Sequence, residues 1–152
     1  MRLFGLLTFI APLVAADLWL KSESTTPAWT SHQRGVAWVV LCFALVPFVL
    51  FVTRIPSSLV PPAAGLLLAG ILGNLLSALS NGLLVANPIL VRGERTELAF
   101  NLADLYAIVG IVVLVAAVCG WLIQHRSALP TATDADKLSR RGDWGSDRRP
   151  LT

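Results

Sequence analysis

The chain has 152 residues, of which 55% are hydrophobic and 14% are charged. This charged fraction is well below the roughly 25% of soluble domains, which excludes an ordinary soluble globular protein and indicates an integral membrane protein. The net charge is +3, but no aromatic or folded platform accompanies the basic residues near the C-terminus, so nucleic-acid binding is not expected.

Four apolar blocks predict four transmembrane helices, at about residues 3–20, 36–53, 59–79 and 105–123. Each block is close to the 20 residues, roughly 30 Å, that a helix needs to cross the hydrocarbon of a bilayer. We therefore expect an all-α membrane protein, with a four-helix transmembrane domain over residues 1–126 and extracytoplasmic loops between helices.

The first block also fits a removable secretory signal peptide. Arg2 precedes the apolar run, and Val14-Ala15-Ala16 resembles a cleavage site. A membrane helix is the favoured interpretation, because apolar residues continue past that site through Leu18, Trp19 and Leu20.

The next two blocks contain residues that affect helix packing. Pro47 lies inside the second block, where a proline is expected to kink a membrane helix. Gly65, Gly70 and Gly73 lie in the third block and should let a neighbouring helix approach closely.

The long loop and the C-terminal segment have different expected roles. Residues 80–104 form a loop of the length that often carries function. Within it, 83–85 and 89–91 are expected either to form short strands or to lie in the membrane interface. Residues 127–152 have little apolar surface to bury, so we expect a disordered, basic, cytoplasmic tail.

Four spans place both termini on the same side of the membrane. Near the membrane, six basic residues lie on that side and four on the other, which modestly favours cytoplasmic termini. A count restricted to the charges in short loops and at helix ends slightly reverses this bias. The terminal side holds Arg2, Arg54, Arg126, Lys137, Arg140 and Arg141, and the opposite side holds Lys21, Arg34, Arg92 and Arg95.

Cysteine and histidine usage predicts no metal site, no cofactor and no disulfide framework. Cys42 and Cys119 lie inside apolar blocks, where they are expected to behave as small apolar helix residues. His32 and His125 are far apart and have no cysteine or carboxylate at ligand spacing.

Five polar residues fall near one membrane face in this topology. Asp17 and Lys21 stand at i and i+4 and can pair. Asn74 is of the type that forms helix–helix hydrogen bonds. Asn101 and Asp104 lie one turn apart, and Asp104 is either a stabilising charge at a helix N-terminus or a functional group at the mouth of a span.

Four motifs, in order, resemble those of the lipoprotein signal peptidase (signal peptidase II) family over about residues 1–125. Asp17–Lys21 resembles its D-x-x-x-K, and Gly35–Trp38 resembles its N-x-G-x-A-F, with Gln33 where Asn is expected. Gly73–Leu76 resembles the start of its G-N-x-x-D-R, and Phe100–Asp104 matches its F-N-x-A-D in full.

The resemblance implies a membrane aspartic endopeptidase of the bacterial cytoplasmic membrane. Such an enzyme cleaves the signal peptide of a diacylglyceryl-modified prolipoprotein on the outer side of that membrane. Two Asp residues share one proton and so supply an acid and a base together. The resemblance assigns one of them to Asp104, whereas the second falls near Ala86 and Asn87.

The second dyad Asp is therefore absent, because no Asp lies between Asp17 and Asp104. The Asp-Arg pair of the third motif is also replaced, by Ser77-Ala78. Glu94 and Glu97 are the acids of the loop and are possible substitutes.

Three hypotheses remain open. The first is a signal peptidase II-like protein with impaired catalysis, which binds the bilayer and either lipid-modified prolipoproteins or another membrane protein. The second is an active endopeptidase that pairs Asp104 with Glu94 or Glu97. The third is a non-enzymatic membrane scaffold or assembly subunit.

Overall fold

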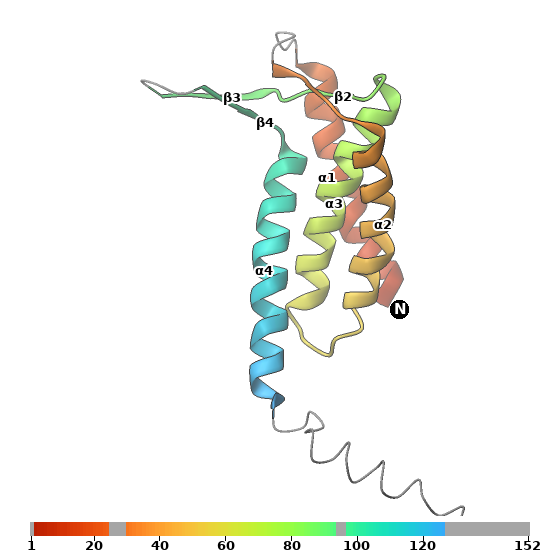
Figure 1. The fold of residues 1–152 in the computed structure, drawn as a ribbon, viewed down its shortest axis with the longest axis vertical. Helices are drawn as coiled ribbons and strands as arrows, with labels where there is room; N and C mark the ends of the chain where they lie inside the picture. The colour runs from red at the N-terminus through yellow and green to blue at the C-terminus, as the bar shows by residue number, and fades with distance from the viewer. Residues whose placement is uncertain (1, 25–29, 94–96, 127–152) are drawn as a thin grey trace, which may run out of the picture. The chain divides into compact units, whose positions relative to one another are not determined.

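The computed structural model describes residues 2–24, 30–93 and 97–126 (Figure 1). The described chain is mostly helical, with two pairs of short strands. The helices are α1 (Arg2–Glu23), α2 (Val36–Val52), α3 (Val60–Ser80) and α4 (Leu102–Gln124). The strands are β1 (His32–Gln33), β2 (Leu84–Val85), β3 (Ile89–Arg92) and β4 (Glu97–Phe100).

The chain divides into two units, residues 1–119 and 120–152. All of the site described below lies in the first unit. In the second unit the described residues complete α4, and Trp121 stacks on His125 with ring centroids 4.7 Å apart. The predicted tail, 127–152, and Glu94 lie outside the described residues.

Within the described residues, three helices are long and apolar enough to cross a membrane: α1 from Gly5, α3 and α4. The helix α2 is apolar but has 17 residues, which is shorter than these spans. Three of the four predicted spans, those of α1, α3 and α4, are therefore confirmed by length and composition. A membrane crossing by α2 stays a prediction.

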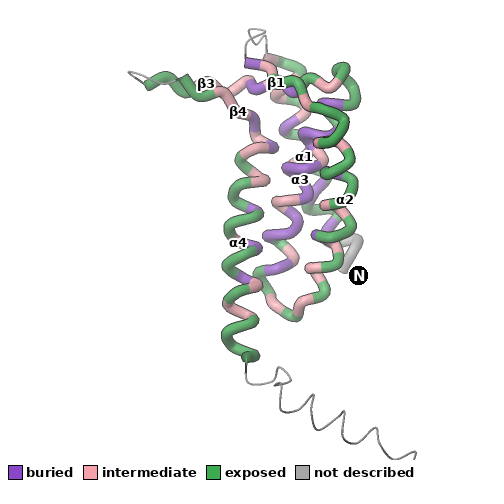
Figure 2. Tube along the Cα trace, in the orientation of Figure 1, coloured by how far each residue is buried: buried purple, intermediate pink, exposed green. Residues whose placement is uncertain are grey.

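The helix α3 is the central element of the first unit. In its spanning segment 67% of the residues are buried, whereas in the spanning segments of α1 and α4 only 11% are buried (Figure 2). Its small buried residues, among them Ala64 and Ala69, pack with Ile10 of α1, Val49 of α2 and Leu114 of α4. Apolar side chains on the outer faces of the other helices stay exposed, as expected for helices that face lipid.

Glycines of α3 permit close helix packing, as predicted. A Cβ at Gly70 would lie 2.5 Å from the carbonyl oxygen of Ala103 and 2.6 Å from the amide nitrogen of Ala107. A Cβ at Gly73 would lie 2.8 Å from Oδ2 of Asp17. The start of α4 and the end of α1 therefore both approach the same stretch of α3.

The loops that follow α1 and α3 and that precede α4 form the two strand pairs. The strands β1 and β2 pair antiparallel, with His32 opposite Val85. The strands β3 and β4 form an antiparallel hairpin, with Ile89 opposite Phe100 and Arg92 opposite Glu97. The strand interpretation of both loop segments is thus confirmed, and β4 ends two residues before α4 begins.

Candidate active site

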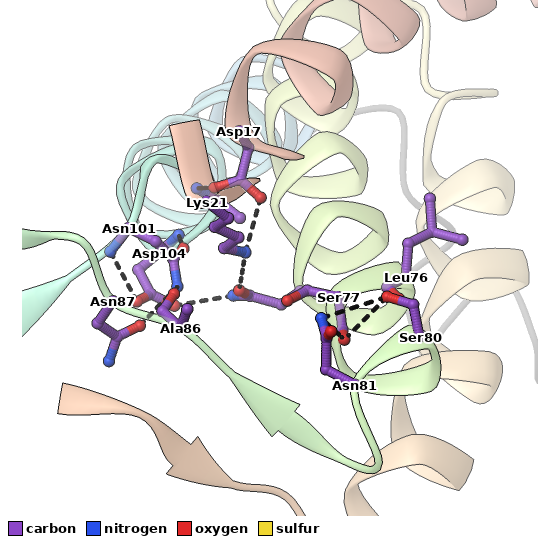
Figure 3. A network of polar contacts seen from close by, with 12 residues as sticks. Asp17, Lys21, Leu76, Ser77, Ser80, Asn81, Ala86, Asn87, Asn101 and Asp104 are labelled. Carbon is purple, nitrogen blue, oxygen red and sulfur yellow. Dashed lines mark hydrogen bonds and ion pairs between the residues drawn. The ribbon is translucent and has the colours of Figure 1, made fainter. Parts of the chain in front are cut away.

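The end of α1 contributes a buried ion pair. Asp17 is fully buried, and its Oδ2 lies 2.7 Å from Nζ of Lys21. The same ammonium donates a second hydrogen bond, of 3.0 Å, to Oδ1 of Asn74 on α3 (Figure 3). The pairing predicted from the i, i+4 spacing is present, and it is connected to the neighbouring helix.

The other oxygen of Asp17 holds the start of α4. Its Oδ1 accepts a hydrogen bond of 2.9 Å from the backbone N–H of Ala103. The first amides of a helix have no partner within the helix, and an anion placed there is stabilised by the helix dipole. Asp17 therefore satisfies a buried donor of α4 in addition to neutralising Lys21.

Asp104 and Asn101 form a reciprocal cap on α4. The side-chain oxygen of Asn101 accepts from the backbone N–H of Asp104 at 2.9 Å, and Oδ2 of Asp104 accepts from the backbone N–H of Asn101 at 3.3 Å. This is the arrangement of a capping box. Oδ1 of Asp104 accepts a further bond, of 2.8 Å, from Nδ2 of Asn74. The carboxylate is thus held in one orientation while staying partly exposed.

The amide of Asn101 continues the network toward the strands. Its Nδ2 donates to Oδ1 of Asn87 at 2.7 Å and to the carbonyl oxygen of Ala86 at 3.3 Å (Figure 3). Nδ2 of Asn87 in turn lies 2.8 Å from Nδ1 of His32. Asn101 and Asn87 are both buried, so their polar atoms depend on these bonds.

The hydrogen-bond directions in this chain fix the tautomer of His32. The backbone N–H of Asp104 only donates, so the atom of Asn101 that faces it is the oxygen. The nitrogen of Asn101 then faces Asn87, which presents its oxygen to Asn101 and its nitrogen to His32. These directions leave Nδ1 of His32 as the acceptor, which assigns the ring proton to Nε2.

A cavity of about 580 Å³ opens beside Asp104. Its polar lining comes from His32, Arg34, Asn87 and Asp104, and its apolar lining comes mainly from Leu98, Phe100, Leu105 and Ile108. Among the described residues that line it, Asp104 is the one acidic residue. Arg34 stacks over Trp38 at 5.1 Å, and its Nε has no hydrogen-bond partner in the described part of the chain.

The two positions to which the resemblance points face different cavities. Asn87 lines the cavity of Asp104, whereas Ala86 lines a neighbouring cavity with Lys21 and Ser77. Asn87 is also connected to Asp104 through a single residue, Asn101. The cavity of Asp104 is therefore lined by an amide, Asn87, at one of these two positions.

Glu97 lies elsewhere. It begins β4 and pairs with Arg92 across the hairpin at 3.3 Å, with 52% of the Glu97 side chain and 70% of the Arg92 side chain exposed. It is absent from the residues that line the Asp104 cavity. The structure thus brings together Asp17, Lys21, Asn74, Asn101 and Asp104, and it leaves Glu97 outside this group.

Sequence reasoning missed two residues of the site, His32 and Arg34. Both lie beside Gln33 and Gly35, in the segment that carries the second motif. That position was the available signal, since an isolated histidine or arginine in a loop indicates nothing by itself.

Comparison with known families identifies the chain. Residues 11–120 match the model of the signal peptidase (SPase) II family. No curated protein and no solved structure matches the chain. The matched segment contains every residue of the hydrogen-bond network and most of the three apolar spans. This multi-pass membrane protein belongs to the signal peptidase II family.

Proposed function

We propose that this protein binds lipid-modified prolipoproteins as a signal peptidase II does, but lacks the carboxylate pair needed to cleave them. The observation that carries the proposal is Asn87, an amide that lines the same cavity as Asp104. A pair of carboxylates that shares a proton supplies both an acid and a base for attack by water. A lone carboxylate supplies only one of the two.

The neighbouring side chains do not replace the missing group. The amide of Asn87 is neither an acid nor a base near neutral pH, and its oxygen is bonded to Asn101 and its nitrogen to His32. Asp17 is fully buried, and its two oxygens are bound by Lys21 and the amide of Ala103. These contacts support a structural role for Asp17.

The cavity retains features that suit a lipidated peptide. Leu98 of β4 and Ile108 of α4, each 61% exposed, give it apolar walls beside a fixed carboxylate. An extended apolar surface next to a few oriented polar groups is typical of ligand sites. We infer that the protein resides in the bacterial cytoplasmic membrane, that α2 is a fourth span and that both termini are cytoplasmic, which places the cavity on the outer side.

The test uses the purified full-length chain in detergent and a synthetic diacylglyceryl prolipoprotein peptide. Binding is measured by fluorescence anisotropy and cleavage by mass spectrometry. We expect saturable binding and no product above the rate without protein, for the wild type and for Asp104→Ala alike. Product that forms with the wild type and disappears in Asp104→Ala would overturn the proposal.

Two further outcomes assign the alternatives. If Asp104→Ala and Glu97→Gln both abolish a wild-type activity, the protein is an endopeptidase that uses those two carboxylates. If the peptide does not bind at all, a scaffold or assembly role without a lipoprotein ligand replaces the proposal. Arg92→Gln serves as the control for Glu97→Gln, because it breaks the same surface ion pair without removing a carboxylate.

A further inference from the structure

A second cavity, of about 570 Å³, is lined by Lys21 but not by Asp104. It is bounded by the ends of α1 and α3 and by residues in and next to β1 and β2. Its polar lining consists of Lys21, Ser22, Ser31, Ser77, Ser80 and Asn81. Figure 3 shows several of these side chains at the ends of the two helices.

Ser77 is the unusual member of this lining. Its side chain is 2% exposed, and its Oγ has no hydrogen-bond partner in the part of the chain that the structure describes. The hydroxyl of Ser80, by contrast, donates to the carbonyl oxygen of Leu76 at 2.8 Å, and that of Ser22 donates to Trp19 at 2.8 Å. A buried hydroxyl without a hydrogen-bond partner destabilises the fold, so we expect Ser77 to bind a partner from outside the described chain.

Lys21 presents a second unused donor to the same cavity. An ammonium group has three N–H donors. Two of them are used, by Oδ2 of Asp17 at 2.7 Å and by Oδ1 of Asn74 at 3.0 Å. The third has no partner among the described residues, and Lys21 lines the cavity together with Ser77.

The charges around the cavity favour an uncharged ligand. Asp17 neutralises Lys21 at contact distance, and Asp104 lies on the far side of Asn74. Lys21 is the one basic residue in the part of the lining that the structure describes. An anion would gain little net attraction there, whereas a neutral oxygen acceptor would satisfy both free donors. Because the Lys21 ammonium donates to two acceptors, it is also unsuited to act as a base for Ser77.

The depth of the cavity indicates where such an oxygen comes from. Lys21 and Ser77 lie within the last turns of two membrane-spanning segments, Gly5–Glu23 and Val60–Ser80. The ends of spans lie at the boundary between hydrocarbon and headgroups, where lipids carry their ester carbonyl groups. Leu18 and Leu84 add apolar walls for the start of an acyl chain. We propose that the Lys21–Ser77 cavity binds the ester carbonyl of a bilayer lipid.

The experiment compares two lipids that differ only in the proposed ligand atom. The full-length protein in detergent is supplemented with dioleoyl phosphatidylglycerol or with its diether analogue, which has the same headgroup and chains but no carbonyl. We expect the diester to raise the melting temperature by about 2–4 °C more than the diether, the shift expected for roughly one additional hydrogen bond in a chain of this length.

Variants make the result specific to the cavity. Ser77→Ala should melt at or above the wild-type temperature without lipid, because it removes an unpaired hydroxyl, and should show no preference for the diester. Ser58→Ala, which changes an exposed serine just before the other end of α3, should keep the preference. Equal stabilisation by the two lipids, or a preference that survives in Ser77→Ala, would overturn the proposal. Equal, Ser77-dependent stabilisation by soluble triacetin would also overturn it, since the ligand would then be a free ester.

Discussion

Removing the two partners of the buried ion pair, singly and together, measures how much the site depends on it. Asp17 and Lys21 are 0% and 6% exposed, and their charged atoms lie 2.7 Å apart. Loss of one partner leaves the other charge buried without compensation, which typically costs about 3–5 kcal/mol. Asp17→Asn and Lys21→Met should therefore each lower the free energy of unfolding by about 3 kcal/mol or more.

The double variant supplies the decisive comparison. Asp17→Asn combined with Lys21→Met removes both charges, so its cost should be smaller than the sum of the single costs by about 2 kcal/mol or more. Unfolding is followed by circular dichroism in detergent. The exposed pair Arg92–Glu97, 3.3 Å apart, is the matched control and should give a coupling below about 1 kcal/mol. Additive costs at Asp17 and Lys21 would refute the reasoning.

Two substitutions and one spectroscopic measurement test the packing and the network. Gly73→Ala places a Cβ 2.8 Å from a carboxylate oxygen and should destabilise the fold by about 1–3 kcal/mol. The control Gly120→Ala, with no atom within 4 Å of the added Cβ, should leave the stability unchanged. Thermal melts compare the two variants. Asn101→Ala removes the cap of α4 and the donor to Asn87, and should cost about 1–2 kcal/mol or more in the same melts. Nitrogen-15 NMR at pH 8 should show His32 with its proton on Nε2; a proton on Nδ1 would contradict the assigned bond directions.

The helices could be predicted from hydrophobicity because each block is long and bounded by polar or proline-rich segments. The predicted third block, 59–79, is displaced by one residue from α3. The predicted fourth block begins at 105, whereas α4 begins at Leu102, because the Asn101 cap adds a turn that is not strongly apolar. The length of α2 in the structure leaves its membrane crossing a prediction.

The site could be predicted only where it depends on local spacing. The Asp17–Lys21 pair follows from the i, i+4 rule, since both residues lie on one helix. The bond from the Ala103 amide to Asp17 joins residues 86 positions apart, and the bond from Asn87 to His32 joins residues 55 apart. Such contacts depend on how the helices pack, and no periodicity in the sequence encodes them.

Which of Ala86 and Asn87 lines the cavity of Asp104 could not be predicted from the sequence, for the same reason. A shift of one residue in an extended segment turns a side chain to the opposite face. The two residues accordingly line different cavities, Asn87 with Asp104 and Ala86 with Lys21.

The most direct test of the central claim restores a carboxylate at the missing position and measures cleavage of the diacylglyceryl prolipoprotein peptide. The account predicts no turnover by the wild type, turnover by Asn87→Asp, and loss of that turnover when Asp104→Asn is added. Ala86→Asp, which faces the other cavity, should stay inactive. Wild-type cleavage that requires Asp104, or a folded, peptide-binding Asn87→Asp variant that remains inactive, would contradict it.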